Sequence, residues 1–334
     1  MRARSTIALA AALVFVMTTL AMSGETVVIQ LGHGQTIVQT SHKALELMAE
    51  EALKRSGGTL EIQIFPANQL GNERDLAESL TQDILDMAWI STAVMENFDS
   101  KLAMFSLPYV FRSFDHVKEV IESEVGDYIF GSLLESNNIR VLGFFDQGFR
   151  WVWNHLRPIN RLEDLHGMKI RSPESPVYMG TFRLLGTNPT PIPWGEVYTS
   201  MQTKVVDGFE VYPESVVANK SYEVCKYGSR TNHIFAGSIL MIREGLWEEL
   251  SPEHQKILSE TAKIAENWNR DTIVSNDMAY RENLKENGMQ LNDLTDAELD
   301  RFAAAVDPLY ADYHDRLGDP TVIQRAKDMY KPGK

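Results

Sequence analysis

The sequence lacks most common signs of catalysis, metal binding and covalent stabilisation. Its single cysteine, Cys225, excludes an intrachain disulfide, so the apolar core must supply the stability. It contains no His-Glu-x-x-His, no Gly-x-Ser-x-Gly, no Gly-rich phosphate loop and no Cys-x-x-Cys. The eight histidines stand singly, with none at metal-ligand spacing, and only His33 in a glycine loop is kept as a candidate site residue. These absences argue against an enzyme and predict neither a metal nor a cofactor.

Long hydrophobic runs are absent beyond the first 22 residues. Arg2 and Arg4 precede an apolar run over residues 7–22, and small residues lead to Ser23. This is the pattern of a secretory signal peptide that is cleaved after residue 23. The run is shorter than the roughly 20 apolar residues of a spanning helix, which disfavours an uncleaved membrane anchor. The sequence therefore predicts an exported and soluble mature protein.

Positive charge is also scarce. The chain has 32 Lys and Arg against 46 Asp and Glu. Loss of residues 1–23 removes two arginines and no acids, which leaves 30 against 46, or a net charge of −16. Such a surface disfavours nucleic acid and anionic bilayers as partners. A protein this acidic binds an acidic small molecule only in a locally positive pocket, so clustered arginines become the candidates of interest.

Strand and helix patterns alternate along the rest of the chain. Residues 26–31 and 60–65 predict strands, and the apolar spacing over residues 45–53 predicts a helix between them. The alternation continues with expected strands at residues 86–90, 139–145, 168–170 and 205–210, and with a long helix at residues 114–134. It predicts an α/β fold of parallel sheets covered by helices. The 311 residues that remain of 334 after the signal peptide are enough for two lobes.

Two further stretches carry specific expectations. Ser251 and Pro252 mark a helix start, and no breaker follows until Gly288. A helix of about 35 residues is roughly 50 Å long, which is more than one lobe needs, so it should span both lobes. The proline-rich residues 188–193 are expected to form an extended connector.

Three charged residues are expected to meet at one sheet edge. Arg150, Arg171 and Glu210 each end a predicted strand, and ligands of open α/β folds bind where parallel strands end. The planar fork of Arg171 matches a carboxylate, although a structural ion pair is an equal alternative for an arginine. Glu210 offsets an arginine or accepts ligand hydroxyl protons, unless it is only an acid at a helix N-terminus. Trp194 is a candidate apolar wall.

Several motifs give the chain a specific resemblance to a known family. The chain resembles the solute-binding proteins of the tripartite ATP-independent periplasmic (TRAP) transporters over essentially its whole mature length. The motifs are Phe65-Pro-Ala-Asn-Gln-Leu-Gly71, Leu107-Pro-Tyr-Val110, Asp164-Leu-His-Gly-Met-Lys-Ile-Arg171, Glu196-Val-Tyr198, Gln202-Thr203 with Val206-Asp-Gly208, and Thr231-Asn-His-Ile234.

The resemblance implies a fold and a set of site residues. The fold is two-lobed and periplasmic-binding-protein-like, each lobe a sheet flanked by helices, joined by hinge strands and a long lobe-spanning helix. Residues 24–147 with about 237–275 would form one lobe, and residues 148–236 with about 276–334 the other. By resemblance, Arg171 grips the ligand carboxylate, Arg150 assists, Trp194 packs on the ligand and Glu73 is an acidic residue of the cleft.

The chain departs from the family pattern at two places. Many relatives carry a ligand-contacting asparagine after Asp-Gly-x-Glu, where this chain has Val211 and then Tyr212. The resemblance therefore does not supply a polar contact there, and these two residues are expected to decide the ligand's identity. Ser91 stands where some sialic-acid-binding relatives have glutamate, which argues against that ligand.

These observations predict a periplasmic, monomeric binding protein. It would capture a small carboxylate by cleft closure and deliver it to the membrane subunits of an ion-driven TRAP permease. Sugar acids such as uronates or aldonates are the first expectation, because Glu73, Glu210 and Gln35 can accept hydroxyl protons, and a keto acid or dicarboxylate is the second. The alternatives from other classes are a periplasmic enzyme acting on an acidic sugar and a protein that presents ligand to a sensor.

Overall fold

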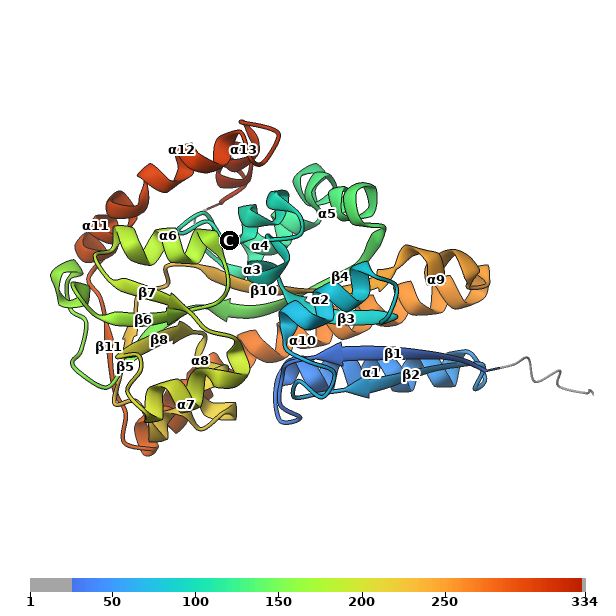
Figure 1. Ribbon diagram of the computed structural model, residues 1–334, viewed down its shortest axis with the longest axis horizontal. Helices are drawn as coiled ribbons and strands as arrows, with labels where there is room; N and C mark the ends of the chain where they lie inside the picture. Colours follow the sequence, from blue (N-terminus) through green and yellow to red (C-terminus); the bar gives the residue numbers. More distant parts are fainter. Residues whose placement is uncertain (1–25, 332–334) are drawn as a thin grey trace, which may run out of the picture.

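The computed structural model describes residues 26–331 of the chain, which fold into two lobes joined side by side (Figure 1). The expected signal peptide, residues 1–23, lies outside the described residues. Within residues 26–331, no helix combines the length and the apolar character that a membrane span requires.

The first lobe is built on a five-stranded sheet with the order β2-β1-β3-β10-β4. Its strands are β1 (Val27–His33), β2 (Leu60–Phe65), β3 (Met87–Ser91), β4 (Ile139–Phe149) and β10 (Phe235–Arg243). Its helices are α1 (Thr40–Arg55), α2 (Glu73–Thr81), α3 (Thr92–Met95), α4 (Phe114–Ile121), α5 (Glu124–Asn137) and α9 (Glu244–Glu249).

The second lobe is built on a six-stranded sheet with the order β11-β9-β5-β8-β6-β7. Its strands are β5 (Trp151–Asn154), β6 (Lys169–Ser172), β7 (Asn188–Pro191), β8 (Gly208–Val211), β9 (Tyr227–Arg230) and β11 (Gln290–Asp293). Its helices are α6 (Pro176–Leu184), α7 (Val197–Gln202), α8 (Pro213–Ala218) and α11 (Asp296–Val306).

Within residues 26–331, two strand connections, one long helix and the C-terminal segment after α11 cross between the lobes. β4 passes directly into β5 at Arg150, and β9 passes into β10 through residues 231–234. The helix α10 (Pro252–Glu286) has 35 residues and is capped by Ser251, as the sequence predicts. It packs on α1 and β4 of the first lobe and on α8 and β11 of the second, and Figure 1 shows it running beneath both.

The expectation of parallel sheets is wrong for part of each sheet. β10 lies antiparallel to β3 and β4, and β5 lies antiparallel to β8 and β9. These strands arrive from the other lobe rather than through a crossover helix, so they enter their sheets in the opposite direction. Arg150 therefore reaches the cleft as a residue of the crossing, and not as the end of a strand parallel to β6.

The expected single helix at residues 114–134 is two helices. The side chain of Ser123 accepts a hydrogen bond from the Val125 amide and starts α5 anew. A Cβ on Gly126 would lie 2.2 Å from the carbonyl oxygen of Ile121, so the glycine permits a close approach of α5 to the end of α4. An apolar spacing that continues across both helices conceals this break.

The proline-rich stretch is a strand rather than a free connector. β7 pairs in parallel with β6 at the edge of the second sheet, with Arg171 opposite Thr190. Prolines are tolerated there because an edge strand leaves half of its backbone amides unpaired by the sheet.

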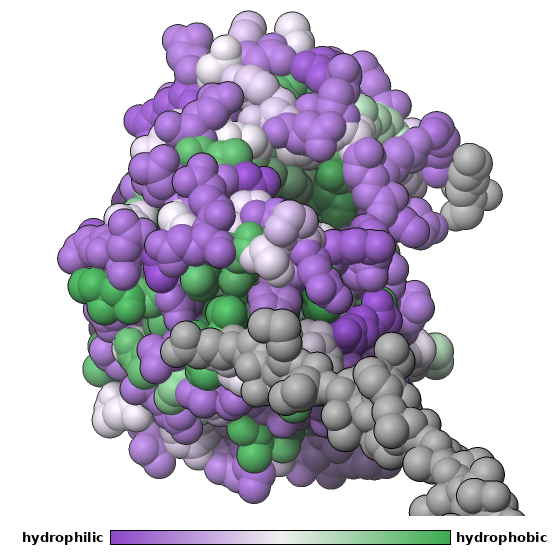
Figure 2. Space-filling view, turned by 90° about the vertical axis from the view of Figure 1, so that its right-hand side faces the viewer, coloured by the Kyte–Doolittle hydropathy of each residue, from purple (hydrophilic) through white to green (hydrophobic). Residues whose placement is uncertain are grey.

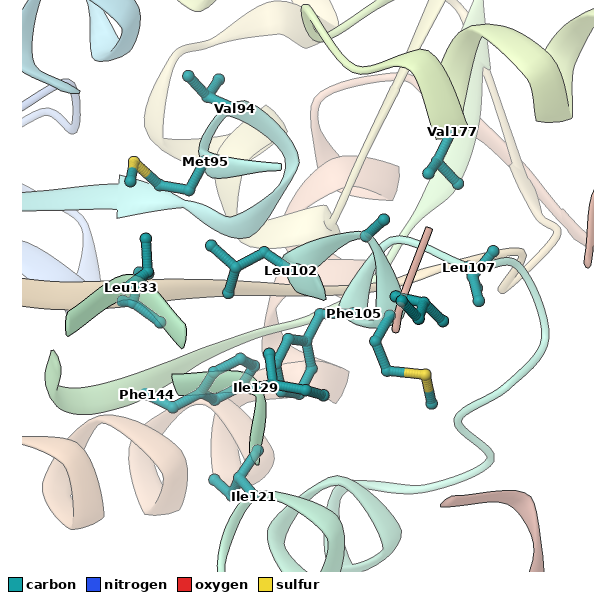
Figure 3. Close-up of a cluster of buried hydrophobic side chains, with 14 of the residues drawn as sticks. Val94, Met95, Leu102, Phe105, Leu107, Ile121, Ile129, Leu133, Phe144 and Val177 are labelled. Atoms are coloured by element: carbon teal, nitrogen blue, oxygen red, sulfur yellow. The ribbon is translucent and has the colours of Figure 1, made fainter. Parts of the chain in front are cut away.

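The first lobe has two apolar clusters, one on each face of its sheet, and the larger includes the side chains of Figure 3. The C-terminal helices α12 (Pro308–His314) and α13 (Val322–Asp328) contribute Leu309 and Ile323 to this larger cluster, and the segment between them contributes Leu317. This segment was expected in the second lobe, and α12 does pack on α6 of that lobe while its apolar side chains also join the core of the first. Figure 1 shows it leading away from α11 toward the first lobe, where α13 packs against α5.

The surface carries the excess of charge. Figure 2 faces the first-lobe end of the molecule, where hydrophilic side chains cover most of the surface and apolar ones appear in separate groups. This distribution fits a chain with a formal charge of −14.

Candidate functional site

A cavity lies between the two lobes, beside both strand crossings. Eight of the ten predicted site residues line it, namely Gln35, Glu73, Ser91, Arg150, Arg171, Trp194, Val211 and Tyr212. The sequence did not point to seven further lining residues, namely Ala93, Gln147, Pro173, Tyr178, Ser215, Ala236 and Gly237. His33 and Glu210 do not line it.

Arg171 on β6 is a buried cation without a counter-ion. It is 3% exposed, and its Nε donates to the carbonyl oxygen of Ile192 at 2.8 Å. Within the part of the chain that the structure describes, no carboxylate lies within ion-pair distance of Arg171. Burial lowers its pKa to about 10, so the group stays charged at neutral pH but has lost its hydration. The cavity therefore presents a guanidinium that no described carboxylate contacts directly, although the charges of Glu210 and Glu73 act on it from a distance.

Arg150 differs because its charge is neutralised. Its Nε contacts a carboxylate oxygen of Glu210, and its Nη2 donates to the other oxygen at 2.9 Å and to the Glu210 carbonyl at 2.7 Å. Burial by itself lowers the pKa of Arg150, but the Glu210 charge outweighs this and raises the pKa above its usual value. Of the two roles expected for Glu210, the geometry supports the neutralisation of an arginine.

His233 completes this buried group and was missed as a site residue. Its Nε2 lies 3.3 Å from Glu210, and its Nδ1 lies 2.8 Å from the hydroxyl of Thr231. Burial tends to raise the pKa of Glu210, but Arg150 and His233 together hold it below its usual value. The only signal in the sequence was the Thr-Asn-His-Ile motif, because the contact joins a strand to a crossing 23 residues away.

Glu73 and Ser91 supply acidic character on the first-lobe side. The Glu73 carboxylate accepts from the Ser91 hydroxyl at 2.7 Å and from the Ser91 amide at 3.0 Å. Burial raises the pKa of Glu73 despite these bonds and the nearby charges of Arg171 and Arg150. The carboxyl group is a hydrogen-bond acceptor for hydroxyl groups, with Ser91 fixing its position.

Gln35 brings an unused acceptor to the cavity. It is 6% exposed, and its side-chain Oε1 is buried without a hydrogen-bond partner among the described residues. His33 lies behind it and accepts from the Gln35 amide through Nδ1 at 3.1 Å, while its Nε2 contacts His42 at 3.0 Å. Burial lowers the pKa of His33 to about 3, so the ring is neutral. His33 therefore supports the Gln35 loop rather than facing the cavity.

Tyr212 is held by a residue that the sequence could not identify. The side-chain amide of Gln147 donates to the Tyr212 hydroxyl at 2.9 Å. Gln147 is the extra residue of a β-bulge, since Ala236 pairs with Gly148 and Gly237 pairs with Asp146. Bulges redirect a side chain, and here the chain is turned into the cavity. The bulge depends on pairing with β10, which lies almost 90 residues away in the sequence.

Two aromatic rings frame the arginines. The Arg171 guanidinium lies 5.6 Å from the ring centre of Trp194, and the Arg150 guanidinium lies 5.0 Å from that of Tyr178. Contacts of this kind keep a cation oriented without neutralising it. Among residues 26–331, the assembled cavity thus offers a cation without a carboxylate in contact, apolar walls and several hydrogen-bond acceptors, and so it suits an anion that carries hydroxyl groups.

A family comparison agrees with this chemistry. Residues 31–316 match the model of the bacterial extracellular solute-binding proteins, family 7. The 2,3-diketo-L-gulonate-binding periplasmic protein of Escherichia coli is 28% identical over 279 residues, which are 83% of this chain and 84% of that protein.

Solved structures of similar proteins extend the comparison. A TRAP periplasmic solute-binding protein from Polaromonas sp. with bound D-erythronate has a TM-score of 0.86 at 26% identity, covering 91% of this chain and 98% of its own. Another from Sulfitobacter sp. with bound β-D-galacturonate has a TM-score of 0.84 at 28% identity, covering 91% of this chain and 99% of its own.

Proposed function

Because the chain belongs to the family 7 bacterial extracellular solute-binding proteins of TRAP transporters, we propose that it captures a small hydroxylated monocarboxylate between its lobes. The observation that carries this proposal is the buried guanidinium of Arg171, which has no counter-ion. A buried cation is costly unless an anion joins it, and a carboxylate matches the guanidinium fork. The ligand carboxylate supplies that missing charge.

The charges in the cavity favour a ligand with one carboxylate over a ligand with two. Arg150 is already paired with Glu210, whereas Arg171 has no carboxylate within ion-pair distance among the described residues. A dicarboxylate would leave its second carboxylate facing Glu73, another acid. One negative end and a polar remainder fit the cavity better.

The cavity provides hydrogen-bond acceptors for hydroxyl groups on the rest of the ligand. Within the described part of the chain, the Oε1 of Gln35 has no hydrogen-bond partner, and the Glu73 carboxylate accepts hydrogen bonds from Ser91 alone. The similar proteins that hold D-erythronate and β-D-galacturonate bind molecules of this kind, a carboxylate on a polyhydroxylated chain or ring. Aldonates and uronates are therefore the ligand class, and a keto acid that lacks hydroxyl groups would leave the acceptors unused.

The family supports a role in ligand delivery to a permease, and the cleavage and the monomeric state are further parts of the proposal. After removal of residues 1–23, the mature protein acts in the periplasm as a monomer and passes its ligand to the membrane subunits of a TRAP permease. N-terminal sequencing of the exported protein and size-exclusion chromatography with light scattering test the cleavage and the monomer. A mature chain that starts elsewhere, or a stable dimer, would contradict these points separately.

The ligand class is tested by thermal shift. D-Galacturonate, D-glucuronate and D-erythronate are each added at 1 mM to the mature protein, with D-galactose and succinate as matched controls. A ligand at 100 times its dissociation constant adds about 2.7 kcal/mol to the free energy of unfolding. Stabilisation by a sugar acid, with little effect of the neutral sugar or the dicarboxylate, is the expected result. Equal stabilisation by D-galactose would contradict the proposed role of Arg171.

A further inference from the structure

A buried carboxylate joins the two lobes next to the cavity. Glu96 follows α3 in the first lobe and is 7% exposed. Its Oε1 accepts from the hydroxyl of Ser175 at 2.6 Å and from the amide of Val177 at 3.1 Å, and both donors belong to the start of α6 in the second lobe. Asn97 donates its Nδ2 to the carbonyl oxygen of Glu174 at 2.6 Å. An acid of one lobe thus caps a helix of the other.

Apolar contacts reinforce this junction. The side chain of Val177 belongs to the large apolar cluster of the first lobe, and Figure 3 shows it extending from α6 toward that cluster. Ala93 of α3, Tyr178 of α6 and Ile234 of the crossing form a further small buried cluster. Ala93 and Tyr178 also line the cavity, whereas Glu96 does not. The junction and the cavity therefore share their supporting elements.

We propose that Glu96 is a positioning residue for ligand capture: by capping α6 across the cleft, it holds Tyr178 at the cavity and slows the release of a bound acid. The hydrogen bonds from the Ser175 hydroxyl and the Val177 amide to Glu96 join the two lobes, and they break when the lobes separate. Glu96 therefore contributes to the closed arrangement without touching the ligand. The inference rests on the proposed capture function, in which Arg171 selects the anion and Glu96 governs how long it stays.

A pH dependence follows from the burial of the carboxyl. Burial raises the pKa of Glu96 to about 7, against the opposing hydrogen bonds from Ser175 and Val177. Two other titratable groups interact electrostatically with Glu96, namely Tyr178 on α6 and Tyr313 on α12. Burial raises the pKa of both tyrosines, so both stay neutral.

The direction of the pH dependence follows from the pKa of Glu96 in the closed and in the separated arrangement of the lobes. Separation of the lobes returns Glu96 to water and to its usual pKa of 4.5. Because the closed arrangement has the raised pKa, its extra stability is fully present below pH 4.5 and is lost as the pH rises through 7. Ligand affinity is expected to weaken by about tenfold or more between pH 5 and pH 8.

Ligand-release kinetics test the proposal. The probe is whichever of D-galacturonate, D-glucuronate and D-erythronate stabilises the wild type most, and stopped-flow fluorescence gives the association and dissociation rates. Glu96→Ala is expected to raise the dissociation rate about tenfold and to leave the association rate nearly unchanged. Glu96→Gln keeps an acceptor oxygen but cannot titrate, so its affinity should be much less dependent on pH between 5 and 8 than that of the wild type. Glu78→Ala, a partly exposed acid on α2, is the matched control and should leave both rates unchanged.

A second readout separates this inference from the proposed function. Cysteines at the exposed Lys54 and Thr199, one in each lobe, carry spin labels, while the native Cys225 is buried. The interlobe distances are measured without ligand and with 1 mM of each of the three acids. Failure of all three acids to bind would count against the proposed ligand class alone, and a wider distance distribution for Glu96→Ala would still support the junction. Identical distributions for wild type and Glu96→Ala, or an unchanged dissociation rate, would overturn the inference.

Discussion

At the scale of single residues, two neighbouring arginines have opposite electrostatic situations. Arg150 is neutralised by Glu210, whereas Arg171 has no carboxylate within ion-pair distance among the described residues. The sequence identified both arginines, because each follows an apolar strand pattern. Their difference depends on which one meets Glu210, and this is decided by the pairing of β5 with β8.

Replacing Arg171 by lysine is predicted to weaken sugar-acid binding at least tenfold. The ammonium keeps the positive charge but loses the planar fork that matches a carboxylate, and one charge-assisted hydrogen bond is worth about 1.5–3 kcal/mol. Isothermal titration with the best-binding sugar acid measures the loss. Arg183→Lys, at the exposed far end of α6, is the control with unchanged affinity. An unchanged affinity for Arg171→Lys would remove the arginine from its assigned role.

Replacing Glu210 by glutamine is predicted to destabilise the ligand-free protein by roughly 3–5 kcal/mol, because Arg150 would be left as a second uncompensated buried cation. The wild type should show a matching pH dependence. Since the pKa of Glu210 is lowered in the folded state, its contribution is present above its usual pKa of 4.5 and is lost as the pH falls through the lowered value.

Urea unfolding of wild type and Glu210→Gln at pH 7 and at lower pH measures both effects. The difference between the two proteins should shrink as the pH falls. The control is Glu78→Gln, whose exposed partner Arg74 makes little contribution to stability. If the difference in the free energy of unfolding between the two proteins stays constant down to pH 3, the charge of Glu210 does not explain its contribution to stability.

At the scale of elements, the sequence located most helices and strands but not their pairing or their breaks. The helix α1, the strand β2 and the long helix α10 lie where periodicity and capping residues place them. The break between α4 and α5 was missed, because the apolar spacing runs through it and only the close approach at Gly126 requires it. Similarly, Gln147 enters the cavity through a bulge that exists only when β4 pairs with β10.

Two glycines of α5 are predicted to respond in opposite ways to alanine. Gly126→Ala should destabilise the protein by roughly 1–3 kcal/mol, since its Cβ would press on the backbone at Ile121. Gly131→Ala should stabilise it by about 0.5–1 kcal/mol, because this exposed helical position has open space and alanine favours the helix. Chemical denaturation of both variants measures the changes, and equal effects would mean that the contact with Ile121 is not responsible.

At the scale of the whole molecule, the two lobes are joined so that they can move around the cavity. The crossings at Arg150 and at residues 231–234 and the helix α10 are the main links. Glycine at position 148 has φ of +106°, a conformation that other residues rarely adopt, and it lies at the first crossing beside Tyr212. A ligand that contacts both lobes shifts such a molecule toward its closed arrangement.

Gly148→Ala is predicted to cost roughly 1–3 kcal/mol in stability and also to weaken sugar-acid binding, because the strained backbone must shift Gln147 and Arg150. The matched control is Gly288→Ala, since Gly288 has φ of +85° at the end of α10, away from the cavity. It should lose similar stability and keep the wild-type affinity. Thermal unfolding and titration of both variants make the comparison, and equal affinities would show that the crossing does not set the geometry of the cavity.

The sequence by itself determined the α/β character of the protein, most element positions, the family and the two arginines, because these depend on local periodicity, capping residues and motif order. Only the tertiary structure decided which arginine is left without a counter-ion, that Gln147 and Tyr178 enter the cavity, and that Glu96 caps a helix of the other lobe. These features depend on strand pairing and lobe contact between residues that are far apart in the chain. Local sequence patterns do not specify which residues far apart in the chain come into contact. The electrostatics of the cavity therefore became visible only in the folded molecule.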